Sequence, residues 1–186
     1  MVFMIFNFNG KDLILLINKK NMKEKSIELL NKAIADELSA VHQYMYFHFH
    51  SDDQGFDLLA GLFRRTAIEE MMHVEKLAER ILFLKGDVDM IPAAKVQQLK
   101  NVKDMLELAR KMEEDSAKEY NIWANECSVN ADAISKQLFE GLVADEERHY
   151  NQYDTELDNI ARFGTNYLAL QSIERSKSIA VPKTGE

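Results

Sequence analysis

The sequence has two prolines, seven glycines and one cysteine among its 186 residues. So few helix-breaking residues leave long uninterrupted stretches, which is typical of all-α proteins. Cys127 is the single cysteine. It excludes an intrachain disulfide framework and a CxxC metal or redox motif, and it fits a reducing compartment, so we expect the protein to be cytoplasmic.

The chain also lacks an excess of basic residues and any long apolar run. Its formal net charge is −8, which argues against nucleic acid as a partner, because nucleic-acid binding depends on clustered lysine and arginine. No apolar run approaches the roughly 18 residues that a membrane-spanning helix needs. We therefore expect neither nucleic acid nor a membrane as a partner, and we expect cations to bind instead.

Residues 1–21 differ in character from the rest of the chain. Their short apolar runs are interrupted by polar residues such as Lys11 and Asp12, and they lack the basic start and the cleavage site of a secretory signal. We interpret them as an N-terminal extension that is either disordered or absent from the natural protein, which would then begin at Met22. No linker divides residues 22–186, which we predict to form one domain.

Apolar residues recur at alternating spacings of three and four in four long segments, the pattern of amphipathic helices. These segments run from about residue 23 to residue 51, from after Gly55 through Leu84, from Asn101 through Cys127, and from residues 130–132 through Leu157. Asn101 is placed to cap the third helix. After Gly164, residues 167–173 predict a short fifth helix.

The lengths of the connections indicate the topology. Short links join the first helix to the second and the third to the fourth, so each pair should form an antiparallel hairpin. Residues 85–101 can extend about 55 Å, whereas a helix of about 30 residues is about 45 Å long. The sequence therefore predicts a four-helix bundle of two hairpins joined by a long crossover.

Each predicted helix carries a glutamate at a position of its apolar seam, and two helices carry a histidine three residues later. A spacing of three places both side chains on one helix face. Corresponding residues of the two hairpins are 76 positions apart, as are Tyr44 and Tyr120. The six candidate catalytic and metal-binding residues are Glu37, Glu70, His73, Glu113, Glu146 and His149.

Four buried carboxylates would repel one another unless cations neutralised them. Two divalent ions supply that charge, and a set of carboxylates and imidazoles suits iron, manganese or zinc. Glutamate combined with Glu-x-x-His motifs is the known pattern of ferritin-like dimetal proteins. The remaining histidines, His42, His48 and His50, lack such a partner, and we expect them at the surface or in packing contacts.

From about Met22 to its tail, the sequence resembles bacterioferritin. The segments that carry the resemblance are residues 30–38, Gln43-Tyr44, residues 70–73 and 79–86, residues 145–149 and residues 166–168. The resemblance implies a ferritin-like fold in which Glu37 and Glu113 are terminal iron ligands, Glu70 and Glu146 bridge two irons, and each histidine binds one. It also implies oxidation of Fe(II) by oxygen or hydrogen peroxide, with storage of the ferric mineral in a shell of 24 subunits.

Further expectations come from the same family. Bacterioferritins bind haem b between two subunits through a methionine from each, and Met71 occupies the matching position. Tyr44 should lie near the metals, with Tyr120 as its internal counterpart. Iron release implies a ferredoxin-type reductant. Arg65 replaces a histidine of an accessory iron site in the family, which disfavours that site because a cation repels metal ions.

Two alternatives remain on the sequence alone. The first is a di-iron or di-manganese oxidase that detoxifies peroxide, of the miniature-ferritin or thioferritin type, although thioferritins carry a cysteine pair that this chain lacks. The second is a structural or DNA-compacting shell in which metals only stabilise the bundle. The acidic charge and the absence of a lysine-rich arm disfavour it.

Overall fold

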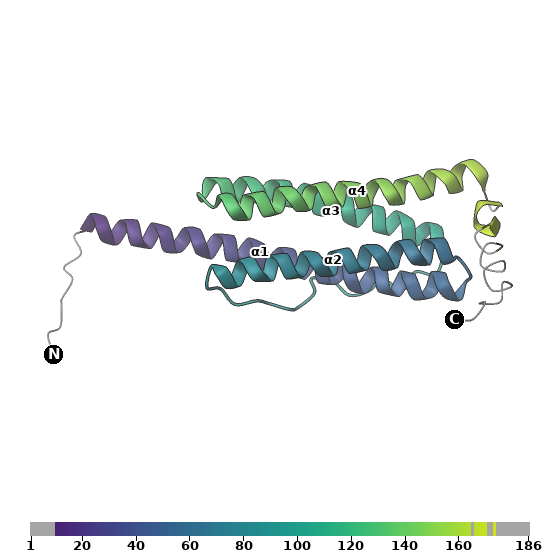
Figure 1. Ribbon diagram of the computed structural model, residues 1–186, viewed down its shortest axis with the longest axis horizontal. Coiled ribbons are helices and arrows are strands. Elements are labelled where there is room, and N and C mark those ends of the chain that lie inside the picture. Colours follow the sequence, from purple (N-terminus) through teal and green to yellow (C-terminus); the bar gives the residue numbers. More distant parts are fainter. Residues whose placement is uncertain (1–9, 165, 171–172, 174–186) are drawn as a thin grey trace, which may run out of the picture.

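The computed structural model describes residues 10–164, 166–170 and 173, with side chains described from residue 23 onward. Four long helices make up most of this part of the chain: α1 (Gly10–Asp53), α2 (Asp57–Phe83), α3 (Val102–Val129) and α4 (Ala133–Phe163). A short helical segment follows at residues 166–170. α1 packs along α2, and α3 packs along α4 (Figure 1). The predicted bundle of two hairpins with a short fifth helix is confirmed.

The helix ends follow local chemistry. The Asn101 side chain caps α3 by accepting hydrogen bonds from the backbone N–H groups of Lys103 and Asp104, as predicted. Asp132 caps α4 through the backbone N–H of Ser135. Gly164 ends α4 with a φ of 62°, a conformation that glycine adopts without steric cost.

α1 begins earlier than the expected position near residue 23. The helix starts at Gly10, and Figure 1 shows it projecting beyond the other three helices at that end. Residues 11–54 contain neither proline nor glycine, so no helix breaker interrupts the chain where the apolar seam stops. Residues 10–21, which we interpreted as part of an N-terminal extension, therefore belong to the first helix.

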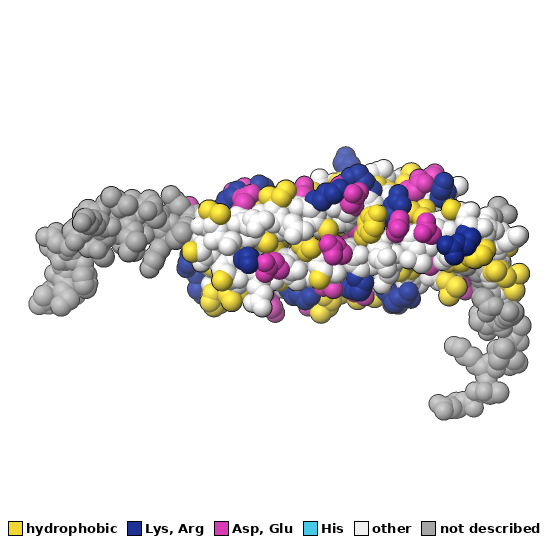
Figure 2. Space-filling model, turned by 90° about the horizontal axis from the view of Figure 1, so that it is seen from above, with side chains coloured by type: hydrophobic (Ala, Val, Ile, Leu, Met, Phe, Trp, Pro, Cys, Tyr) yellow, Lys and Arg dark blue, Asp and Glu magenta, His cyan; other side chains and the backbone are white. Residues whose placement is uncertain are grey.

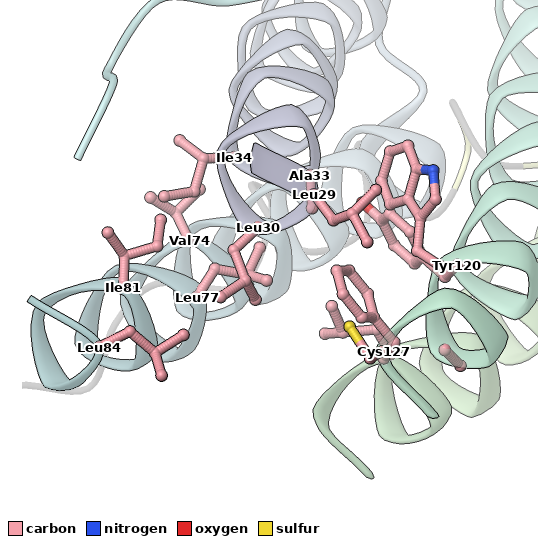
Figure 3. Packing of buried hydrophobic residues seen from close by; sticks show 14 residues of the cluster. Leu29, Leu30, Ala33, Ile34, Val74, Leu77, Ile81, Leu84, Tyr120 and Cys127 are labelled. Atoms are coloured by element: carbon pink, nitrogen blue, oxygen red, sulfur yellow. The ribbon is translucent and has the colours of Figure 1, made fainter. Parts of the chain in front are cut away.

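Two clusters of buried apolar residues follow one another along the bundle. The first contains Leu30 of α1 and Cys127 of α3, and Figure 3 shows its side chains converging between the helices. The second contains Phe47 of α1 and Tyr153 of α4. Burial of this apolar surface is the main force that holds the four helices together.

The order of the two clusters along each helix gives its direction. α1 contributes residues 29–34 to the first cluster and residues 40–47 to the second, and α4 follows the same order with residues 139–142 and 153–157. α2 and α3 pass through the clusters in the opposite order. α1 and α4 are thus parallel to each other and antiparallel to α2 and α3.

The crossover between α2 and α3 runs along α1, which supplies partners for its backbone. Near its start, the backbone N–H of Asp89 donates to the Asn31 side chain over 2.9 Å. Further along, Gln43 accepts a hydrogen bond from the backbone N–H of Gln97 over 2.7 Å and donates one to its carbonyl oxygen over 3.0 Å. These side chains fix the long connection that the sequence predicted.

The surface shown in Figure 2 mixes acidic and basic side chains with scattered apolar ones. Many of the charges pair along single helices, such as Lys111 with Asp115 and Lys118 with Glu114. Among the described helices, none combines the length and the apolar character that crossing a bilayer requires. In contrast to these surface charges, several glutamates and histidines are buried inside the bundle.

Candidate metal centre

A polar layer separates the two apolar clusters in the middle of the bundle. All six residues predicted from the sequence lie in it, and none is more than 2% exposed. Each helix contributes to the layer because its glutamate interrupts the apolar seam between the residues of one cluster and those of the other. The layer contains Glu37, Glu70, His73, Glu113, Glu146 and His149.

One half of the layer is centred on His73. Its Nδ1 lies 2.8 Å from Oε2 of Glu70, 3.3 Å from Oε1 of Glu37 and 3.4 Å from Oε1 of Glu146. These four residues come from α1, α2 and α4, and each offers one ligand atom within 4.8 Å of the others. Four donor atoms converging at this separation can surround a single ion.

The other half repeats this arrangement around His149. Its Nδ1 lies 3.0 Å from Oε1 of Glu70, 3.5 Å from Oε2 of Glu113 and 3.7 Å from Oε2 of Glu146. Glu70 and Glu146 therefore direct one carboxylate oxygen toward each histidine. The two groups of potential ligands therefore share Glu70 and Glu146, and each group adds one further glutamate and one histidine.

Several atoms of the layer are buried without a hydrogen-bond partner. They are both carboxylate oxygens of Glu70, Oε1 of Glu146 and Nδ1 of both His73 and His149. Buried polar atoms without partners are costly and rare in folded proteins. All of these atoms can bind a metal ion, and they belong to the two groups of potential ligands. Divalent metal ions therefore fit the site, and this set of carboxylates and imidazoles suits iron or manganese.

The pKa values of the layer residues also indicate that the layer needs positive charge. Burial, reinforced by repulsion from Glu70 and Glu146, raises the pKa of Glu37 well above its usual range. Burial disfavours a charged His73, but the neighbouring carboxylates of Glu146, Glu37 and Glu70 outweigh it and raise the pKa of His73 to about 12. The metal-free protein must therefore hold protons where metal ions would supply the charge.

The far ring nitrogens of both histidines contact acidic side chains outside the layer. Nε2 of His73 lies 3.2 Å from Oδ2 of Asp145, and Nε2 of His149 lies 2.7 Å from Oε2 of Glu69. A carboxylate at this position accepts the Nε2–H and keeps the Nδ1 lone pair directed at the metal position. In the sequence, Glu69 and Asp145 directly precede the glutamates of the two Glu-x-x-His motifs. The sequence alone did not predict that they contact the histidines.

Two tyrosines cross between the hairpins to reach the layer. The Tyr120 hydroxyl on α3 donates to Oε1 of Glu37 on α1 over 2.9 Å. The Tyr44 hydroxyl on α1 donates to Oε1 of Glu113 on α3. Both tyrosines thus hold a glutamate of the opposite hairpin, and the internal repeat of the sequence appears here as a reciprocal contact.

The other residues singled out in the sequence lie away from this layer. Met71 is 48% exposed on the outer surface of α2. His48 contacts the carbonyl oxygen of Ala60 through Nδ1, and the His50 ring packs at a tilt against the Tyr46 ring. His42 is exposed. None of these histidines joins the metal centre, as expected.

Comparison with solved structures agrees with this architecture. The X-ray structure of Desulfovibrio desulfuricans bacterioferritin, which shows its diiron site in different catalytic states, superposes with a TM-score of 0.81 at 34% identity and covers 83% of this chain and 90% of its own. The Rhodobacter capsulatus bacterioferritin, with a metal-free dinuclear site and a haem iron in a crystallographic special position, gives a TM-score of 0.77 at 31% identity and covers 88% and 98%.

Sequence comparison leads to the same family. The bacterioferritin of Brucella melitensis is 39% identical over 75% of this chain and 87% of its own length. That of Desulfovibrio desulfuricans is 35% identical over 82% and 85%. The model of the ferritin-like domain family matches residues 27–163, a range that contains all six residues of the layer. This chain therefore belongs to the bacterioferritins, within the family of ferritin-like domains.

Proposed function

We propose that this protein is a ferroxidase and an iron store, and that the polar layer is its ferroxidase centre. Its substrate is Fe(II), bound as a pair in each chain. Membership of the bacterioferritin family supports this function. The observation that carries it is the placement of Glu70 and Glu146, which direct one oxygen each toward His73 and His149.

In this proposal the six residues have distinct roles. Glu37 and His73 complete one iron position, while Glu113 and His149 complete the other. Glu70 and Glu146 bridge the two positions, so that their negative charges are shared by both ions. Four carboxylates balance two divalent ions, and further binding of anions or loss of protons is needed when the ions become trivalent.

The reaction is a two-electron oxidation of the bound pair. Each Fe(II) gives up one electron, and oxygen takes up both together with two protons and leaves as hydrogen peroxide. With hydrogen peroxide as oxidant, the two electrons and two protons give two molecules of water. Binding both ions in one layer allows one oxidant molecule to receive two electrons, which avoids release of a one-electron oxygen radical.

We further propose the assembly and cofactors that the family implies. The chains form a 24-subunit shell that stores the ferric product, and the protein acts in the cytoplasm, where a ferredoxin-type reductant supports iron release. Haem b binds between two subunits through Met71 of each, which supplies a thioether to the haem iron. The exposed position of Met71 fits this role, because a ligand shared across a subunit interface must lie at the surface of the isolated chain.

Anaerobic addition of Fe(II) to the metal-free protein, followed by oxygen, tests the proposal. Ultraviolet-visible spectra and particle size are recorded together. We expect fast oxidation of about two Fe(II) per chain and then continued loading into a particle of several hundred kDa. Fast oxidation without mineral would favour a peroxide-detoxifying oxidase instead. Absence of oxidation would leave the carboxylate layer as a structural site for another metal.

A further inference from the structure

Arg148 lies outside the metal centre, yet it is connected to both halves of it. Its Nη2 donates to Oε2 of Glu69 over 2.8 Å and to Oδ1 of Asp145 over 3.0 Å. Glu69 in turn accepts from His149, and Asp145 accepts from His73. One guanidinium nitrogen thus closes a continuous path of hydrogen bonds from one metal-binding histidine to the other, outside the carboxylate layer.

The path also links two helices. Glu69 belongs to α2, whereas Asp145 and Arg148 belong to α4. Without a cation between them, the two carboxylates would repel each other, because both lie within hydrogen-bond distance of the same nitrogen. Each would then turn toward solvent and release the Nε2–H of its histidine.

We propose that Arg148 is a positioning residue that holds both metal-binding histidines in register for metal ions. It acts through Glu69 and Asp145, which it keeps in place to accept the two Nε2–H groups. Both Nδ1 atoms then remain directed into the layer before a metal ion arrives. This inference rests on the proposed metal centre and adds to it a residue whose side chain acts through Glu69 and Asp145.

The two halves of the centre should not depend on Arg148 equally. Asp145 has a second cationic neighbour, since Nζ of Lys76 lies 4.0 Å from its Oδ2. Among the side chains that the structure describes, Glu69 has no lysine or arginine partner other than Arg148. Loss of the guanidinium should therefore loosen His149 more than His73.

A simple surface ion pair would behave differently. Arg148, Glu69 and Asp145 are all about 34–44% exposed, and exposed ion pairs contribute little to folding stability. Arg110 offers a matched comparison, because it forms a 2.7 Å ion pair with Asp154 of α4 at similar exposure and contacts none of the six residues. A purely structural role would make the two arginines equivalent.

Titration of the metal-free assembled protein with cobalt(II) chloride tests the inference without catalysis. The visible absorption of Co(II) reports both affinity and coordination geometry. We expect the parent protein and Arg110→Ala to bind two Co(II) per chain with the same affinity. Arg148→Ala should bind about tenfold more weakly, the lower end of the range for loss of an outer partner, with the larger loss in one of the two binding steps. Arg148→Lys should recover part of the affinity, since an ammonium group can lie between the same carboxylates.

The outcomes separate this inference from the proposed function. Equal Co(II) affinity and spectra for Arg148→Ala and the parent protein would overturn the role of Arg148 while leaving the metal centre intact. A loss that Arg148→Lys does not relieve, or that comes with a drop in melting temperature absent from Arg110→Ala, would also overturn it. A parent protein that binds no Co(II) would refute both the metal centre and this inference.

Discussion

Glu70 connects the two halves of the metal centre through a single side chain. Its two oxygens lie nearest to different histidines, Oε2 to His73 and Oε1 to His149. Both oxygens are buried and have no hydrogen-bond partner. A residue in this position contributes little to the stability of the metal-free protein and much to the binding of a pair of ions, because only cations satisfy both of its oxygens at once.

Replacing Glu70 and His73 with alanine should abolish rapid Fe(II) oxidation while leaving the shell assembled. The double variant loses one bridging carboxylate and one histidine, so neither ion position keeps its full ligand set. We expect the initial oxidation rate, followed by ultraviolet absorbance, to fall more than about 100-fold, beyond the range seen for loss of an outer partner alone.

The matched control for this variant replaces Glu75 and Glu79, two exposed acids of the same helix, with alanine. It should oxidise Fe(II) at the parental rate and form particles of the same size. An undiminished rate in the Glu70→Ala, His73→Ala protein would remove the ferroxidase assignment from this layer.

The six layer residues could be predicted from the sequence because they break a pattern. A glutamate such as Glu37 is unexpected at an apolar position of a helix. The same feature recurs 76 residues later, which strengthens the interpretation of these glutamates as metal ligands. Arg148 breaks no pattern, since an arginine on a polar helix face is ordinary. Its role depends on contacts across α2 and α4, which only the folded arrangement provides. The same is true of the reciprocal contacts of Tyr44 and Tyr120.

The start of α4 is fixed by one side chain that serves two helices. Asp132 accepts a hydrogen bond from the backbone N–H of Ser135 and pairs with Arg80 of α2 over 2.5 Å. Burial opposes its ionisation, but the hydrogen bonds from Ser135 and Arg80 outweigh it and hold the pKa of Asp132 below its ordinary value. Asp132 therefore couples the N-terminus of α4 to the C-terminal half of α2.

Asp132→Ala should destabilise the metal-free protein at neutral pH by about 2 kcal/mol, because it removes a helix cap and leaves Arg80 without its carboxylate partner in a mostly buried position. A lowered pKa makes the contribution of Asp132 fully present above the unfolded-state value of about 4 and lost as the pH falls through the lower folded-state value. The difference in melting temperature between parent and variant should therefore narrow below about pH 4.

Asp154→Ala is the control for this prediction, because it removes an ion pair of α4 that has no capping role. The side chains of Arg110 and Asp154 are 38% and 36% exposed, against 13% and 11% for Arg80 and Asp132. We expect its effect on the melting temperature to be small, as for other exposed pairs. A melting-temperature difference for Asp132→Ala that stays constant down to pH 2 would contradict the proposed coupling.

The helices themselves could be predicted more fully than their ends. Apolar spacing located all four, and the capping residue Asn101 placed the start of α3 correctly. The start of α1 was missed because an apolar seam reports burial against other helices, whereas a helix continues wherever no residue breaks it. As a result, α1 begins at Gly10, more than ten residues before the start of its apolar seam.

The course of the crossover determines how the two hairpins are related. Because it runs along α1, it returns the chain to the end where α2 began, so α2 and α3 point the same way. The glutamates of both hairpins then meet at the same height, midway between the apolar clusters. The sequence predicted this meeting from the length of residues 85–101 and the internal repeat, but not the side chains Asn31 and Gln43 that fix the path.

Met71, the expected haem ligand, is exposed in the single chain. Met71 lies on the outer surface of α2, next to the exposed side chains of Ile68 and Met72. These apolar side chains form no part of the core of this chain. A haem with Met71 as its ligand would need a second subunit to cover its other face, so haem binding and subunit pairing should occur together.

Met71→Leu should remove the haem absorption band near 400 nm from protein purified with haem supplied, because leucine fills a similar volume but has no sulfur to bind the haem iron. Met72→Leu is the matched control, since Met72 is 44% exposed on the same helix, against 48% for Met71, and should keep the band. Both variants should oxidise Fe(II) at the parental rate, because the two methionine side chains are exposed, whereas the side chains of the polar layer are buried. Retention of the band by Met71→Leu would exclude this residue as the ligand, whereas its loss, together with intact particles on size-exclusion chromatography, would place the haem at the surface where two subunits meet.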